Sequence, residues 1–321
     1  MVVLVCLLSV ALTFVLVPPV IALSWRIGAV DIPSDWRRMH RESVTRGGGI
    51  AIFLGFFASS LALGRADLSL SCALAGGALM LAVGLIDDMI CLDAWIKLLF
   101  QVAIGTAAVL GSGVRDGVGA PLAILWVLTL TNAHNFIDGL DGLLSGVAAV
   151  EGIGLFLALT LLGVGDAAIY PLLLSLACLG FRYFNRYPAR VFAGDSGSGT
   201  VGFLLGMLSL PLFGATASGL GLLAPLLVFG YPLTDLIAAV TRRLLRGKSP
   251  FRADRAHLHH RLIDARLSVP QATGALTLIS AGLAALGVLL TLESLWLAGA
   301  AVSAGMALLL MRIRRYVLDF S

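Results

Sequence analysis

Apolar runs long enough to cross a lipid bilayer recur along the whole chain. A membrane-spanning helix needs about 20 consecutive residues that are mostly apolar. Because 59% of the 321 residues are hydrophobic and 12% are charged, too few polar side chains are present to cover a soluble domain of this size. We predict an all-α, polytopic membrane helical bundle that forms one domain over residues 1–321, with eleven spanning helices, or ten as the alternative. The predicted spans are 2–24, 48–64, 69–86, 95–112, 120–136, 143–163, 167–184, 198–214, 219–240, 271–291 and 294–311.

The first apolar run is expected to remain in the membrane. It lacks the basic segment and the small-residue cleavage site of a secretory signal peptide. We predict a first spanning helix that is kinked or ended near Pro18 and Pro19. The four cysteines lie scattered in apolar runs without CxxC spacing, so no disulfide framework is expected.

Lysine and arginine residues predict the orientation, because cytoplasmic loops carry an excess of both. If the loop after the first span is cytoplasmic, all 22 Lys and Arg residues except Arg65 and Arg115 lie on the cytoplasmic side. The amino terminus is then outside and the carboxyl terminus is cytoplasmic. Nearly all polar side chains suited to catalysis or binding fall in five cytoplasmic loops, at about 25–47, 87–94, 131–142, 185–197 and 241–270.

The loop at 131–142 reads T-N-A-H-N-F-I-D-G-L-D-G between two apolar runs. Ionisable groups at membrane depth are costly, so they usually face a cavity or a substrate. Asp138 and Asp141 are three residues apart and share one face if the segment is helical. Asn132 and Asn135 add two carboxamides. We expect part of an active site here, and the alternative is a polar turn between two spans.

The loop at 87–94 begins with two adjacent carboxylates, Asp87 and Asp88. Such a pair repels unless a cation or a proton is shared. Lys97 follows at the start of the next span, and carboxylates beside a lysine suit Mg²⁺ and phosphate chemistry. Asp93 is expected to cap the helix that follows.

Two further loops suit phosphate groups. Asp195 lies among Gly194, Gly197 and Gly199 at a predicted helix start, where backbone N–H groups can bind phosphate and Asp195 can bind a metal ion. The first loop carries a basic cluster that suits phosphates or anionic lipid headgroups. Its members are Arg37, Arg38, His40 and Arg46.

The last loop contains H-L-H-H-R, with His257, His259, His260 and Arg261. Three histidines can hold zinc. The surrounding arginines and the aspartates elsewhere favour phosphate contacts instead. Glu151 and Asp235 are predicted to be buried structural carboxylates paired across helices.

These loops together resemble the polyprenyl-phosphate N-acetylhexosamine-1-phosphate transferases, in glycosyltransferase family 4. The matching segments, in the order of that family, are D-D-M-I-C-L-D-A-W-I-K-L-L-F-Q, N-A-H-N-F-I-D-G-L-D-G, P-A-R-V-F-A-G-D-S-G-S and H-L-H-H-R-L. The last segment resembles the branch that starts O-antigen, enterobacterial common antigen or teichoic acid linkage units. The first loop departs from the family, because Ser43, Val44 and Thr45 stand where prolines are usual, and its role is left open.

The resemblance also implies roles for individual residues. It implies Mg²⁺, with Mn²⁺ as a substitute, bound by Asp195 with Asn135 as a second ligand. Asp141 and Phe192 are implied to lie against uracil. The catalytic residues implied are Asp87, Asp88, Asp138 and Lys97, with the first two near the prenyl phosphate. The remaining implied substrate contacts are Arg46, Asn132, His257, His259, His260 and Arg261.

The implied reaction moves a sugar-1-phosphate from a UDP-sugar to undecaprenyl phosphate at the cytoplasmic face of a bacterial inner membrane, with release of UMP. GlcNAc is the expected sugar, and FucNAc, QuiNAc and MurNAc-pentapeptide stay open, as does a homodimer. No nucleic-acid partner is expected. An ion-coupled transporter is the alternative from another class. A phosphatidyltransferase is disfavoured because the D-G-x-x-A-R signature is absent.

Overall fold

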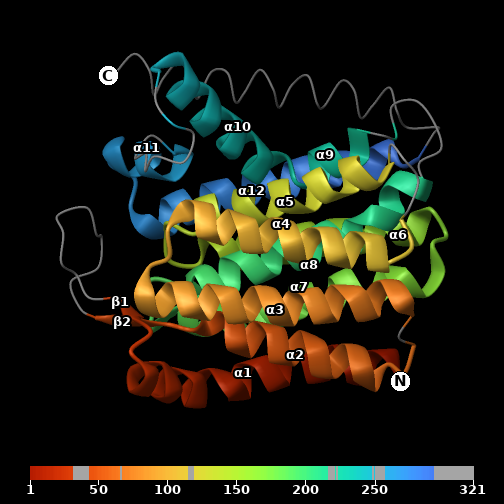
Figure 1. The fold of residues 1–321 in the computed structure, drawn as a ribbon, viewed down its shortest axis with the longest axis horizontal. Helices are drawn as coiled ribbons and strands as arrows, with labels where there is room; N and C mark the ends of the chain where they lie inside the picture. The colour runs from red at the N-terminus through yellow and green to blue at the C-terminus, as the bar shows by residue number, and fades with distance from the viewer. Residues whose placement is uncertain are drawn as a thin grey trace.

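The computed structural model describes residues 1–31, 43–65, 67–114, 119–215, 221, 223–247, 249 and 257–292. Long helices lie side by side in a bundle, with strands β1 and β2 and helix α11 at one end and Met1 at the other (Figure 1). The helices are α1 Val2–Ile27, α2 Gly48–Ala62, α3 Leu68–Ile90, α4 Ala94–Gly111, α5 Gly119–Ile137, α6 Leu143–Leu161, η1 Gly165–Ala168, α7 Ile169–Asn185, α8 Gly194–Ala215, α9 Ala224–Val228, α10 Gly230–Leu245, α11 Leu258–Asp264 and α12 Val269–Leu290. The strands are β1 Val30–Asp31, β2 Val44–Arg46 and β3 Val191–Phe192.

Eight helical segments within the described ranges are long and apolar enough to cross a membrane. They are α1, α3, α4, α5, α6, η1 with α7, α8 and α12. The chain is therefore a polytopic helical membrane protein. Helices α6 and α8 form the interior, since 72% of the residues in the most apolar stretch of each are buried. The same fraction is 28% for α1 and α4, which therefore face outward. The predicted span at 294–311 lies outside the described residues.

The structure divides one predicted span into two helices. The sequence suggested a single helix over 219–240, but the described part of this region holds two helices, α9 and α10, separated at Phe229. Pro232 explains the break, because its ring would clash with the carbonyl group four residues earlier, at Val228, where α9 ends. Elsewhere, α1 continues through Pro18 and Pro19, so the first helix does not end there.

A small sheet ties two helix pairs together at one end of the bundle. Strand β1 pairs antiparallel with β2, and β2 pairs parallel with β3. Since β1 and β2 connect α1 to α2, and β3 connects α7 to α8, the sheet joins the ends of four helices. Its register places Arg46 beside Phe192.

Glycines let two helices approach the start of α8 closely. A Cβ atom at Gly84 of α3 would lie 2.4 Å from the Ser196 Cα atom. A Cβ atom at Gly49 of α2 would lie 2.4 Å from the backbone nitrogen of Gly197. Only glycine fits at these distances, so α2 and α3 pack directly on the first turn of α8.

Candidate active site

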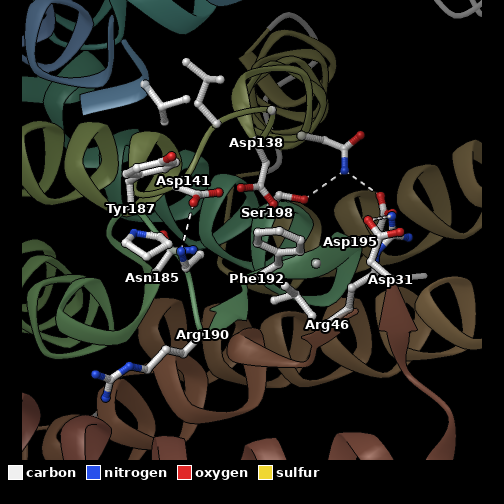
Figure 2. A pocket seen from close by; sticks show the side chains of 18 of the residues that line it. Asp31, Arg46, Asp138, Asp141, Asn185, Tyr187, Arg190, Phe192, Asp195 and Ser198 are labelled. Atoms are coloured by element: carbon white, nitrogen blue, oxygen red, sulfur yellow. Dashed lines mark hydrogen bonds and ion pairs between the residues drawn. The ribbon is translucent and has the colours of Figure 1, made fainter. Parts of the chain in front are cut away.

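A cavity of about 1130 Å³ opens where the sheet, the loop after α5 and the start of α8 meet. In Figure 2, Asp138 and Ser198 lie above the Phe192 ring, with Asp195 on one side and Tyr187 on the other. Small-molecule pockets span about 300–1,000 Å³, so this cavity has room for a large ligand. The predicted site residues that line it are Arg46, Asn135, Asp138, Asp141, Phe192, Asp195 and His260.

Lys97 lies between two carboxylates beside this cavity. Its Nζ atom donates to Asp87 Oδ2 at 2.8 Å and also contacts Asp195 Oδ1. The other oxygen of Asp87 accepts the backbone N–H of Leu92 at 2.7 Å. Both oxygens of Asp87 are therefore engaged, and the ammonium group links α3, α4 and α8.

Asp88 holds the start of α8. Its two carboxylate oxygens accept the backbone N–H groups of Asp195 at 2.8 Å and Ser196 at 3.0 Å. Free N–H groups at a helix start attract negative charge, so a carboxylate from α3 stabilises this turn. Gly194 precedes it with φ +74°, and a Cβ atom there would lie 2.5 Å from Asp88 Oδ2.

Asp195 is also fixed from the last turn of α5. Asn135 Nδ2 donates to Asp195 Oδ1 at 2.6 Å and to Ser198 Oγ at 2.8 Å (Figure 2). Asp138, just beyond the end of α5, faces the same region. Loss of hydration, with the neighbouring carboxylates of Asp195 and Asp88, raises the pKa of Asp138 to about 8. Three carboxyl groups, those of Asp88, Asp138 and Asp195, are thus close enough to influence one another at this end of the cavity.

The donor groups here suit a hard divalent cation. Carboxylate, amide and hydroxyl oxygens are the ligands that Mg²⁺ takes in proteins. Within the described ranges, no three acidic, cysteine or histidine side chains are already grouped closely enough to hold one ion. Asn135 turns its amide nitrogen toward Asp195, and Lys97 contacts the same carboxylate. The residues fit Mg²⁺ by donor chemistry and charge, not as a preformed ligand set.

The rest of the cavity lining combines a ring with polar groups. Phe192 projects into it from β3 (Figure 2). Asp141 Oδ2 accepts the backbone N–H of Ala189 at 2.9 Å, which fixes the loop before β3. Arg46 pairs with Asp31 at 2.7 Å. A ring face, an acid and a guanidinium group within one cavity can bind a base and a phosphate.

The histidines of the last loop lie against the loop after α5. His259 is 1% exposed, and its Nε2 atom would lie 2.2 Å from a Cβ atom at Gly139. Burial lowers the pKa of His259 to about 3, and the nearby imidazole of His260 adds to the shift. His259 is therefore neutral at pH 7. His257 is buried behind it, while His260 lines the cavity.

Some predicted residues lie elsewhere. Asn132 donates to Gln101 Oε1 at 2.9 Å, away from the cavity lining. Asp93 occupies the N-cap position of α4, as predicted, but its side chain makes no capping hydrogen bond there. Arg261 is half-buried on α11. The basic residues Arg37, Arg38 and His40 lie outside the described part of the chain.

The pairing of buried carboxylates was predicted in general, but not the partners. Glu151 Oε2 lies 2.7 Å from His134 Nε2, with both side chains fully buried. Asp235 pairs with His257. Arg243, whose guanidinium group lies 5.1 Å from the Phe136 ring centroid, was missed. A basic residue at helical spacing from Asp235 was the available signal.

Fold and site together define a polytopic membrane protein with an acid-rich cavity at one end of the bundle. The family model described as glycosyl transferase family 4 matches residues 70–212. A "Probable undecaprenyl-phosphate N-acetylglucosaminyl 1-phosphate transferase" of Bacillus subtilis is 33% identical over 277 residues, which cover 80% of this chain and 76% of the relative. The chain belongs to glycosyl transferase family 4.

Two further relatives have similar coverage. A "Decaprenyl-phosphate N-acetylglucosaminephosphotransferase" of Mycobacterium tuberculosis is 35% identical over 302 residues, covering 79% of this chain and 73% of the relative. An "Undecaprenyl-phosphate alpha-N-acetylglucosaminyl 1-phosphate transferase" of Escherichia coli is 31% identical over 293 residues, covering 82% and 77%. The likeness therefore extends over most of each chain.

Proposed function

We propose that the protein transfers GlcNAc-1-phosphate from UDP-GlcNAc to undecaprenyl phosphate. An oxygen of the acceptor phosphate forms a bond to the β-phosphorus of the donor. The bond from that phosphorus to the bridging oxygen breaks, and the oxygen leaves with UMP. The names of the three relatives support a polyprenyl phosphate acceptor and a GlcNAc-1-phosphate group.

The observation that carries this proposal is the meeting of separate acidic segments around Lys97. Asp87 and Asp195 come from helices far apart in the sequence, yet both contact its ammonium group. Asp195 also lines a cavity into which Phe192 projects from β3. Two anionic substrates repel each other, so a phosphotransferase needs positive charge beside its binding cavity. Lys97 supplies one such charge, and the carboxylates around it suit a divalent cation.

Most of the chemistry falls to positioning and charge. Phe192 would stack on uracil, with Asp141 against the base edge, and Arg46 and His260 would face the diphosphate. Lys97 would lie near the acceptor phosphate. A bound Mg²⁺, held by Asp195 with Asn135 as a second ligand, would neutralise phosphate charge, and Mn²⁺ would substitute for it. Asp138 completes the catalytic group. Burial raises its pKa most, and the carboxylates of Asp195 and Asp88, whose charge a cation would offset, raise it further.

Asp87 is proposed to position groups and not to act as a general base. A phosphate monoester has a second pKa of about 6, so the acceptor is largely a dianion at pH 7. Both oxygens of Asp87 already accept hydrogen bonds, from Lys97 and from Leu92. Asp88 is engaged in the same way by the start of α8. These contacts favour holding Lys97 and Asp195 in place.

The proposed setting is a bacterial inner membrane with the cavity facing the cytoplasm. Eleven spans follow from the apolar runs, and an external amino terminus and a cytoplasmic carboxyl terminus follow from the distribution of Lys and Arg. The site would then be built from the five cytoplasmic loops of one integral-membrane transferase domain. The proposal involves no nucleic acid and does not depend on a homodimer.

The test is to incubate the purified protein with undecaprenyl phosphate, Mg²⁺ and a panel of UDP-sugars, and to measure UMP. We expect UMP with UDP-GlcNAc, no UMP after chelation with EDTA, and recovery with Mg²⁺ or Mn²⁺. Release with UDP-FucNAc, UDP-QuiNAc or UDP-MurNAc-pentapeptide instead would keep the reaction and change the sugar. No UMP from any donor, or full activity in metal-free buffer, would contradict the proposal.

An ion-coupled transporter is the alternative from another class. It would move solute across proteoliposomes without releasing UMP. The position of the cavity disfavours this alternative. Residues of β2 and β3 line the cavity, and the sheet lies at one end of the bundle (Figure 1), whereas carriers of this kind bind their substrates near the membrane midplane.

A further inference from the structure

Asp235 on α10 holds the histidine loop from outside the cavity. Its carboxylate is buried, and it does not line the cavity. One oxygen accepts the backbone N–H of Leu258 at 2.9 Å, and the other lies 2.7 Å from His257 Nδ1. His257 precedes α11 and makes no side-chain capping bond of its own. Asp235 therefore caps α11 and orients His257 at the same time.

This contact fixes which nitrogen of His257 carries the proton. An ionised carboxylate can only accept hydrogen bonds. Nδ1 must therefore be the protonated nitrogen when Asp235 is ionised, which leaves Nε2 as the free nitrogen of the neutral ring. A carboxylate that selects one tautomer in this way prepares an imidazole for a defined role.

The orientation of His257 is passed on through ring contacts. The His257 and His259 rings stack with centroids 5.6 Å apart and planes 9° apart. The His259 and His260 rings follow at 4.2 Å, and His260 lines the cavity. On the other side, the Phe136 ring lies 5.4 Å from His257 and holds Arg243 of α10 over its face. A shift of His257 would therefore move rings that reach the cavity.

We propose that Asp235 is a positioning residue for the transfer reaction. It sets the tautomer of His257 and, through the stacked rings, the direction in which His260 faces the substrate. This inference rests on the proposed function, and α10 thereby becomes part of the catalytic apparatus although it contributes no group to the cavity wall among the described residues.

Asp235→Asn separates positioning from capping. The asparagine has the same shape, and its oxygen can still accept the N–H of Leu258. Its amide nitrogen then faces Nδ1 of His257 and can only donate, which selects the opposite tautomer. If Asp235 only caps α11, the Asp235→Asn protein should keep its activity. If Asp235 sets the tautomer of His257, the substitution should lower activity.

The experiment compares the wild type with Asp235→Asn, His257→Gln and the double variant, using kcat and KM for UDP-GlcNAc. Thr234→Ala is the matched control, because Thr234 is exposed on the same helix and bonds only to Gly230 in the described contacts. We expect Asp235→Asn to lower kcat at least about tenfold with KM changed less than about threefold. Adding Asp235→Asn to the His257→Gln variant should lower kcat by less than about a further twofold. Thr234→Ala should behave as the wild type.

A second readout does not depend on activity. Nitrogen-15 NMR of histidine side chains distinguishes protonated Nδ1 from protonated Nε2, and the chain has five histidines, so His257→Gln assigns the signal. We expect protonated Nδ1 in the wild type and protonated Nε2 in Asp235→Asn. An unchanged tautomer, a kcat within about twofold of the wild type, or additive losses in the double variant would overturn the inference. A wild type that releases no UMP would contradict the proposed function instead, and the NMR result would still test the Asp235–His257 contact.

Discussion

The ammonium group of Lys97 contacts carboxylates from two other helices, Asp87 and Asp195. These three side chains are 17%, 9% and 27% exposed, so the contacts are largely shielded from water. Removing one partner of a shielded ion pair leaves uncompensated charge, which costs about 3–5 kcal/mol when burial is complete and less here. The arrangement makes Lys97 the residue on which the geometry of both acids depends.

Lys97→Met should therefore lower kcat/KM for UDP-GlcNAc about 100-fold, because the substitution keeps the length of the side chain and removes its charge. UMP release measures the effect. Asp93→Asn is the control, since Asp93 is exposed four residues earlier and makes no capping bond. Asp93→Asn should retain activity within about twofold. A Lys97→Met protein that works nearly as well as the control would show that the ammonium group is dispensable.

The lowered pKa of His259 makes the stability of the fold depend on pH. Its pKa is about 3 in the folded protein, below the unfolded value of 6.5, so the unfolded chain binds more protons between these values. Stability is then complete above pH 6.5 and is lost as pH falls toward 3, by at most about 1.4 kcal/mol per pH unit. Thermal unfolding in detergent between pH 7.5 and 5 should show a larger fall in Tm for the wild type than for His259→Gln. Parallel curves would contradict the shift.

At the scale of helices, the start of α8 depends on how closely α3 approaches. A Cβ atom at Gly84 would lie 2.4 Å from the Ser196 backbone, and Asp88, one turn further along α3, bonds to the N–H groups of Asp195 and Ser196. A change in the distance between these helices must therefore move the acidic cluster.

Gly84→Ala should push α3 away from α8 and lower kcat at least about tenfold, with overpacking costing about 1–3 kcal/mol of stability. UMP release and thermal unfolding measure the two effects. Gly274→Ala in α12 is the matched control, because its Cβ atom would meet nothing within 4 Å. Equal behaviour of the two variants would mean that α3 can yield without disturbing Asp88.

The sequence predicted most long helices because apolar length is a strong signal. The spans at 69–86, 95–112 and 143–163 agree with α3, α4 and α6 to within a few residues. Strands of two or three residues are too short to give an alternating pattern, so the sheet was not predicted. The break before α10 was not predicted, because the residues on both sides of Pro232 are mostly apolar and suggest one continuous helix.

Site residues could be predicted from the sequence where several polar side chains lie close together in the chain. Asp87, Asp88 and Lys97 are within one turn-and-helix segment, and the structure adds Asp195 to them. The partner of His257 could not be read in this way, because Asp235 is 22 residues away on another helix. Long-range pairs depend on how helices pack, which a pattern of apolar residues does not specify.

For the whole molecule, the proposed orientation places the cavity end in the cytoplasm. Cys91 is exposed near that end, whereas Asp166 is exposed in η1 at the other. With Cys6, Cys72 and Cys178 replaced by serine, a membrane-impermeant maleimide should label Cys91 in inverted vesicles and not in right-side-out vesicles. An added Asp166→Cys substitution on a Cys91→Ser background should give the opposite pattern. Labelling of both sites from one side would reject the topology.

The pairing of Arg46 with Phe192 in neighbouring strands has a further consequence. The two side chains belong to one sheet, so the spacing between the ring and the guanidinium group is set by the backbone and not by flexible loops. If the ring binds the base and the guanidinium group binds the phosphates, the sheet fixes the distance between these two contacts. The donor must then be long enough to span that distance. A nucleotide sugar with a single phosphate would be too short to reach both contacts, and we expect it to compete poorly with UDP-GlcNAc.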